Sequence, residues 1–124
     1  MTLLIIRMNV LSEKRMELSQ TIASLSSNIK MEKGCPRSDF CQSKEDENKF
    51  FLLEEWNTQE NLKDYLKSEH FKVIRGAMNL LKEPYEMKFH TVFQPAGMEN
   101  DLKVAIRSKK ILPKLLVPSI EKVA

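Results

Sequence analysis

Trp56, His70 and Asn9 carry side chains that could act directly on a small molecule. The Trp56 indole N–H can donate a hydrogen bond to a substrate oxygen. The His70 imidazole has a nitrogen that can accept a proton, so it could serve as a base. The Asn9 amide could orient a substrate oxygen. A donor, a base and an orienting amide are the groups that proton abstraction from a bound molecule needs.

Each of these three residues also has a purely structural explanation. Trp56 ends an apolar run and could be a core residue whose N–H meets a backbone carbonyl. His70 falls in the first turn of a predicted helix, where a half-exposed histidine is ordinary. Asn9 closes a predicted strand, where asparagine often makes turns. The sequence alone leaves both interpretations open.

Three further side chains are candidates for binding a substrate. Arg7 and Glu54 interrupt apolar strands, where a charge is costly unless it is paired. We expect them first to form an ion pair, with each other or across a dimer, and otherwise to line a cavity. Tyr65 is expected on the apolar face of its helix.

The sequence contains no motif typical of a metal site or of nucleophilic catalysis. Cys35 and Cys41 lie six positions apart, without a CxxC motif or a neighbouring histidine, so we expect two reduced thiols. The chain shows no nucleophile with an activating base, no glycine-rich phosphate loop and no carboxylate dyad. We therefore predict no metal and no cofactor.

Hydrophobic periodicity predicts the element order β-α-β-β-α-β. The expected strands span residues 2–10, about 37–43, 49–56 and 85–93. Helices are expected after Ser12, Thr58 and Ser68, each a capping residue, with ends near Gly34 and Pro84. Met16 is expected in the apolar stripe of the first helix. This order is the α+β, ferredoxin-like arrangement with a four-stranded antiparallel sheet.

The first and third predicted strands are apolar on both faces, at least in part. Two helices can cover only one face of a four-stranded sheet, so the other face needs a different cover. A second copy of the chain, stacked sheet on sheet, is the simplest cover. We therefore predict a homodimer with two-fold symmetry.

Composition is that of an ordinary soluble domain, with 42% hydrophobic and 30% charged residues in 124 positions. We expect one domain over residues 1–94 and a basic, apolar extension over residues 95–124. That extension carries the whole net charge of +3, which is weak support for nucleic-acid binding, so no nucleic-acid partner is predicted.

Two further expectations concern the location of the protein in the cell and the packing of residues 95–124. No segment has the roughly 20 apolar residues of a membrane span, and the N-terminus lacks the pattern of a signal peptide, so a cytoplasmic location is expected. The 95–124 extension is expected to pack on its own domain or on the partner subunit. A membrane-surface contact is the alternative.

The segments "KGC", "FFLLEEW" and "NTQENLKDYLKSEHFK" carry a family resemblance. Residues from about 3 to 93 resemble the antibiotic biosynthesis monooxygenase family of dimeric α/β barrels, which includes small quinol monooxygenases. The resemblance implies oxidation of a quinol or polycyclic phenol with O₂, without metal or flavin. It implies catalytic roles for His70, Trp56 and Asn9. Arg7, Glu54 and Tyr65 would contact the small aromatic substrate.

Two alternatives accompany this interpretation. Haem-degrading oxygenases of the staphylococcal type, a related branch, have an asparagine and a tryptophan at strand ends, as Asn9 and Trp56 are here. Their iron-ligand position falls on Arg75, and a guanidinium cannot ligate iron, which argues against haem. The other alternative is a non-catalytic dimer that binds a small molecule.

Overall fold

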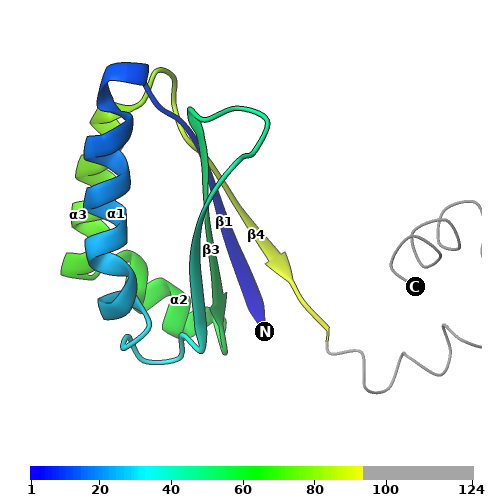
Figure 1. The fold of residues 1–124 in the computed structure, drawn as a ribbon. Coiled ribbons are helices and arrows are strands. Elements are labelled where there is room, and N and C mark those ends of the chain that lie inside the picture. Colours follow the sequence, from blue (N-terminus) through cyan, green and yellow to red (C-terminus); the bar gives the residue numbers. More distant parts are fainter. Residues whose placement is uncertain (94–124) are drawn as a thin grey trace, which may run out of the picture. The chain divides into compact units, whose positions relative to one another are not determined.

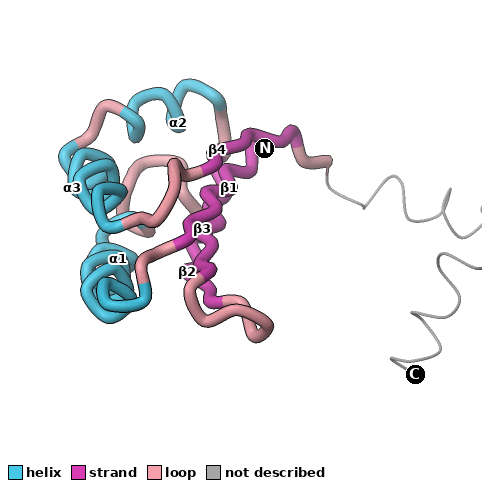
Figure 2. Tube along the Cα trace, turned by 90° about the horizontal axis from the view of Figure 1, so that it is seen from above, coloured by secondary structure: helices cyan, strands magenta, loops and turns pink. Residues whose placement is uncertain are grey.

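In the computed structural model, which describes residues 1–93, a single antiparallel sheet carries all its helices on one face (Figures 1 and 2). Figure 2 shows the strands as one layer and the helices as a second layer beside it. The elements are β1 (Thr2–Asn9), α1 (Arg15–Ile29), β2 (Arg37–Gln42), β3 (Lys49–Trp56), α2 (Gln59–Leu66), α3 (Glu69–Ala77) and β4 (Glu86–Thr91). The strand order β2-β3-β1-β4 confirms the predicted ferredoxin-like α+β fold.

Alternation along the two central strands decides which side chains form the core. In β1, Leu4, Ile6 and Met8 are buried under the helices, and the intervening residues face the opposite way. In β3, Phe50 and Leu52 are buried on the same side, where the register places them opposite Met8 and Ile6. Each such side chain contributes about 1.5–3 kcal/mol when fully buried, so this two-strand centre anchors the fold.

The helices complete the core with residues at helical spacing. The buried positions are Leu18, Ile22, Leu25 and Ile29 in α1, Leu62 and Tyr65 in α2, and Phe71, Ile74 and Ala77 in α3. Thr58 and Ser68 cap α2 and α3 as predicted, because their hydroxyls accept hydrogen bonds from the backbone N–H groups of Asn61 (3.0 Å) and Phe71 (3.2 Å).

The first helix differs from its prediction at both ends. Ser12 caps nothing: it begins a 3-10 turn (Ser12–Lys14), and its hydroxyl accepts a hydrogen bond from the Asn48 amide. The α-helix ends at Ile29, before Gly34, which lies instead in the loop that leads to β2. Met16 is 72% exposed, so its place in the apolar stripe was also predicted wrongly.

The end of α3 also differs from its prediction. The helix stops at Ala77 and continues as a 3-10 turn over Met78–Leu80, so Pro84 does not mark its end. Pro84 lies instead in the connection to β4, which begins at Glu86. The change to a tighter turn is common at helix ends.

The other face of the sheet is apolar at its centre and charged around it. Leu3, Ile5, Phe51 and Leu53 are half-buried there, and the register sets Ile5 opposite Leu53. This open face is the one on which we predict a second copy of the chain. No helix in residues 1–93 is long and apolar enough to cross a membrane. The predictions for residues 95–124 lie outside the described residues.

Gly34 offers a direct test of the loop before β2. Its φ is +83°, and a Cβ there would lie 2.1 Å from Asn61 Nδ2, so both backbone and space require glycine. We expect Gly34→Ala to lower the free energy of unfolding by about 1–3 kcal/mol, measured by urea denaturation. Gly76→Ala is the matched control, because its Cβ meets nothing within 4 Å. It should stabilise α3 by up to about 1 kcal/mol, and equal losses in both variants would contradict this account.

Candidate functional site

The candidate residues named from the sequence divide between two ends of the sheet. The register of β1 and β3 places Asn9 opposite Lys49 and Trp56 opposite Thr2. The two positions are seven residue steps apart along the strands, which is roughly 23 Å. Asn9 ends β1 and Trp56 ends β3, but these strands are antiparallel, so their last residues lie at opposite ends of the sheet. Within one chain, they therefore cannot belong to one site.

Glu54, Trp56 and Tyr65 form a buried cluster between the sheet and α2. All three are almost fully inaccessible to solvent. The Tyr65 hydroxyl donates a hydrogen bond to Glu54 Oε2 at 3.0 Å. The rings of Trp56 and Tyr65 stack, with centroids 4.4 Å apart. Period-two alternation turns Glu54 and Trp56 toward the helices, and the apolar face of α2 brings Tyr65 over them.

Burial governs the electrostatics of this cluster. It raises the pKa of the Glu54 carboxyl from an ordinary value of 4.5 to about 7, although the Tyr65 hydroxyl and the Trp56 indole favour the charged form. Burial, together with the neighbouring Glu54 charge, also raises the pKa of Tyr65. Glu54 can therefore exchange a proton near neutral pH, whereas Tyr65 stays protonated and acts as a donor.

The expected ion pair between Arg7 and Glu54 is wrong. The two side chains lie on opposite faces of the sheet, because Arg7 belongs to the open face and Glu54 to the helix-covered face. Arg7 lies instead over the ring of its cross-strand partner Phe51, 6.0 Å from the centroid. Glu54 accepts a hydrogen bond from Tyr65 and has no cationic partner among residues 1–93, so burial disfavours its charged form.

Within residues 1–93, three buried polar atoms in and beside this cluster have no hydrogen-bond partner: Glu54 Oε1, Trp56 Nε1 and Ser38 Oγ. The Trp56 indole is near enough to favour the Glu54 carboxylate, yet the two groups do not meet in hydrogen-bonding geometry. Ser38 pairs with Glu54 across β2 and β3, so it faces the same side. An acceptor, a donor and a hydroxyl side by side suit a ligand hydroxyl group. No sequence pattern singled out Ser38, because its neighbour Glu54 is identified only by strand register.

His70 lies at the surface rather than in the buried cluster. It occupies the first turn of α3, and its Nδ1 lies 2.7 Å from Glu32 Oε1. The two side chains are 37% and 25% exposed. Glu32 belongs to the loop after α1, which also carries the buried Cys35. Burial, with the nearby Glu54 charge, raises the pKa of the Cys35 thiol to about 11, so this thiol is unreactive near neutral pH.

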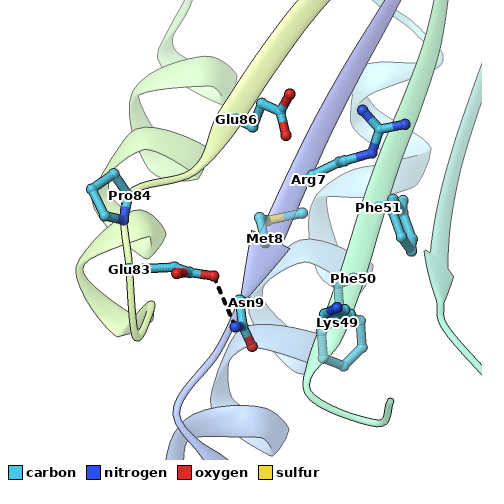
Figure 3. A pocket seen from close by; sticks show the side chains of 9 residues that line it. All are labelled: Arg7, Met8, Asn9, Lys49, Phe50, Phe51, Glu83, Pro84 and Glu86. Atoms are coloured by element: carbon cyan, nitrogen blue, oxygen red, sulfur yellow. Dashed lines mark hydrogen bonds between the residues drawn. The ribbon is translucent and has the colours of Figure 1, made fainter. Parts of the chain in front are cut away.

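Arg7 and Asn9 line an open pocket of about 340 Å³ at the other end of the sheet (Figure 3). Figure 3 shows Asn9 turned toward Glu83, to which its amide donates a hydrogen bond of 2.9 Å. Lys49 and Glu86 add charges of both signs. Lys88, and more weakly Arg7, lower the pKa of the exposed Glu86 carboxyl. This pocket is wide, but it holds no buried titratable group, so acid–base chemistry favours the Glu54 cluster.

Binding of a metal ion or a haem iron depends on clusters of ligating side chains and on the residue at the haem-ligand position. Residues 1–93 hold no cluster of three His, Cys, Asp or Glu side chains that could bind a metal ion. Arg75, at the position of the haem ligand in the haem-degrading branch, places its guanidinium 5.2 Å from the Phe71 ring centroid. This cation covers an aromatic residue that packs edge-on against Tyr65.

Comparison with known proteins points in one direction. The family model described as antibiotic biosynthesis monooxygenase matches residues 1–77. A search of curated proteins gave no match.

Among solved structures, a putative antibiotic biosynthesis monooxygenase from Nitrosomonas europaea is similar at 20% identity, with 76% of this chain and 100% of that chain covered and a TM-score of 0.71. A conserved protein from Methanosarcina mazei is 24% identical, over 74% of this chain and 92% of its own, with a TM-score of 0.70. A putative family member from Caulobacter crescentus is 20% identical, over 75% and 90%, with a TM-score of 0.69. At these identities the solved structures show a shared fold.

The proton on Glu54 should appear in the pH dependence of stability. Between about pH 4.5 and 7 the folded chain retains a proton that the unfolded chain has released, so stability falls as pH rises through this window. We expect Glu54 to contribute a loss of roughly 3 kcal/mol at most, measured by urea denaturation at several pH values. Glu54→Gln should flatten this part of the profile. Glu55→Gln, on the open face, should not, and a profile unchanged by Glu54→Gln would refute the assignment.

Proposed function

The chain belongs to the antibiotic biosynthesis monooxygenase family, and from that premise we propose that it oxidises an electron-rich phenol or quinol with O₂, with Glu54 as the proton acceptor. The observation that carries the proposal is the buried Glu54 carboxyl, which accepts a hydrogen bond from Tyr65 beside the stacked rings of Trp56 and Tyr65 and has a pKa of about 7. A base works best when its pKa lies near the working pH.

Deprotonation is the step for which these residues are suited. A phenol hydroxyl has a pKa of about 10, so transfer of its proton to Glu54 is uphill by about 4 kcal/mol. The Trp56 N–H and the Ser38 hydroxyl, both unpartnered, can donate to the phenolate oxygen. Hydrogen bonds to a charged group contribute about 1.5–3 kcal/mol each, so two of them offset the cost. Tyr65 keeps Glu54 in place through its own hydrogen bond.

The overall reaction balances without an added reductant. One oxygen atom of O₂ enters the ring or its activated CH₂ position, and the other leaves as water. The substrate loses four electrons in all: two bond the inserted oxygen, and two reduce the second atom. The phenolate supplies these electrons because its negative charge makes the ring a good donor.

Glu54 is a better base than His70 in this proposal. The described structure pairs His70 with Glu32 at the surface, whereas Glu54 lies among the unpartnered donors. Asn9 and Arg7 would then serve a separate surface pocket rather than the reacting atoms. Trp56 and Tyr65 keep the roles that the sequence suggested for them, as a donor to the substrate and as a cavity residue.

A second candidate function is non-catalytic binding of a small aromatic molecule. The burial of Glu54, Trp56 and Ser38 favours this function, because it keeps bulk solvent away from these polar groups. A cytoplasmic location would suit either function, because Cys35 and Cys41 are both free.

We further propose that the open face of the sheet forms a two-fold homodimer. The half-buried residues Leu3, Ile5, Phe51 and Leu53 gather at the centre of that face. Arg37, Asp39, Glu55 and Lys88 surround them through the strand register. An apolar centre with a charged rim is the usual anatomy of a protein interface.

Oxygen consumption tests the proposed reaction. With a hydroquinone or an anthrone as substrate, we expect the wild-type protein to consume O₂ above the uncatalysed rate. Glu54→Gln should lower kcat by about 10²–10⁴-fold, because it removes the base, and Trp56→Phe should lower it less. Glu55→Gln should retain full activity. If folded Glu54→Gln consumed O₂ normally, Glu54 would not be the base. If Trp56 fluorescence reported binding without any O₂ uptake, the non-catalytic function would replace the oxidation.

Light scattering tests the dimer. The wild-type protein should have twice the 14.5 kDa mass of one chain. Leu53→Lys should give a monomer, because a charge in the apolar centre cannot be paired across the two-fold axis. Val73→Lys, which replaces an exposed apolar residue on α3, is the control and should stay dimeric. A monomeric wild-type protein at micromolar concentration would contradict the proposal.

A further inference from the structure

The loop between α1 and β2, residues 30–36, lies against the Glu54 cluster. The Asn57 backbone N–H donates to Gly34 O at 2.8 Å, which holds the loop at the end of β3 that carries Trp56. Cys35, 5% exposed, turns inward from this loop. Its thiol lies near the buried cluster: the Glu54 charge raises the pKa of Cys35, and Cys35 contributes to the raised pKa of Tyr65. In Figure 1 the loop runs past the end of the sheet beside α2.

This loop is the most weakly attached wall of the cluster. Among residues 1–93, two hydrogen bonds tie the loop to parts of the domain distant in sequence: Asn57 N to Gly34 O, and the Glu32–His70 contact. Its other hydrogen bonds within those residues are local, such as Cys35 N to Glu32 O at 3.2 Å. Met31 of the loop is 85% exposed, whereas Cys35 is buried, so Cys35 is the side chain that attaches the loop to the core. The opposite wall is β3, which is paired along its length with β1 and β2.

A substrate with an aromatic ring cannot reach buried Glu54 unless some wall moves. Opening a strand would break a ladder of backbone hydrogen bonds, and opening a capped helix would expose core side chains. Moving the loop breaks two links, one of which joins side chains that water already reaches in part. The loop is therefore the wall that opens at the lowest cost.

We propose that residues 30–36 form a gate over the Glu54 cluster and that the Glu32–His70 pair is its latch. The proposal rests on the proposed function only in naming this cluster as the site. His70 is then a positioning residue, which holds the gate closed and does not touch the substrate. It accounts for a close contact between residues 38 positions apart in the sequence.

Two residues of the chain report on the gate without any substrate. Cys35 is buried under the loop, and Trp56 is the chain's only tryptophan. In a Cys41→Ser background, which removes the exposed thiol, we would measure the rate at which a neutral thiol reagent modifies Cys35 at fixed pH. Quenching of Trp56 fluorescence by acrylamide gives a second measure of access.

We expect His70→Ala to raise the rate of Cys35 modification about three- to tenfold and to increase acrylamide quenching, because a charge-assisted hydrogen bond is lost. Glu32→Ala should act similarly. The double variant should be no faster than either single variant, since both remove one interaction. His90→Ala, which changes the exposed histidine of β4, should leave both readouts unchanged.

Global unfolding is excluded by a core variant. Leu18→Ala removes a buried side chain of α1 and lowers overall stability by about 2–5 kcal/mol. If it accelerated Cys35 modification as much as His70→Ala does, access would follow global unfolding and the gate would be refuted. Unchanged modification in His70→Ala would refute the latch. Neither result depends on O₂ uptake, so the gate and the proposed reaction can fail separately.

Discussion

The buried carboxyl of Glu54 is the constraint on which the rest of this structure depends. Taking a carboxylate out of water costs several kcal/mol, and no cation in the described part of the chain pairs with Glu54. That cost is large beside the 5–15 kcal/mol by which a typical domain is stable. The fold meets it in part with one hydrogen bond from Tyr65 and in part by shifting Glu54 toward its neutral form. An apolar side chain of similar size would pack at lower cost, so a carboxyl at this position is more readily explained by chemistry than by stability.

The corner between β3 and α2 sets the geometry of that carboxyl. β3 ends at Trp56, and Thr58 caps the next helix two residues later. So short a connection fixes the direction in which α2 leaves the sheet. Tyr65, in the second turn of α2, then lies over the last inward-facing residues of β3. The hydrogen bond between Tyr65 and Glu54 thus follows from two local features: the Thr58 cap of α2 and the alternation of side chains along β3.

The sequence predicted the element order and two helix caps, and it failed at helix ends and at contacts that depend on register. The capping residues Thr58 and Ser68 began their helices as expected, whereas Ser12 does not cap α1. The Arg7–Glu54 pair failed because burial was known for each strand but the relation between their faces was not. Ser38 was missed for the same reason: its neighbour Glu54 is identified only by the β2–β3 register. Glu32 and His70 meet through tertiary packing, which no short-range pattern reports.

Strand β3 connects the proposed site with the proposed interface, because its alternate residues serve different faces. Glu54 and Trp56 point toward the helices, and Phe51 and Leu53 point to the open face. A second copy on the open face would remove β3 from water on both sides. Burial already raises the pKa of Glu54, and further exclusion of water would raise it more. Dimer formation would then change the pKa of Glu54 without adding a residue to the site. In such an arrangement the partner subunit affects the chemistry through the dielectric surroundings of β3, so interface and site are coupled through one strand.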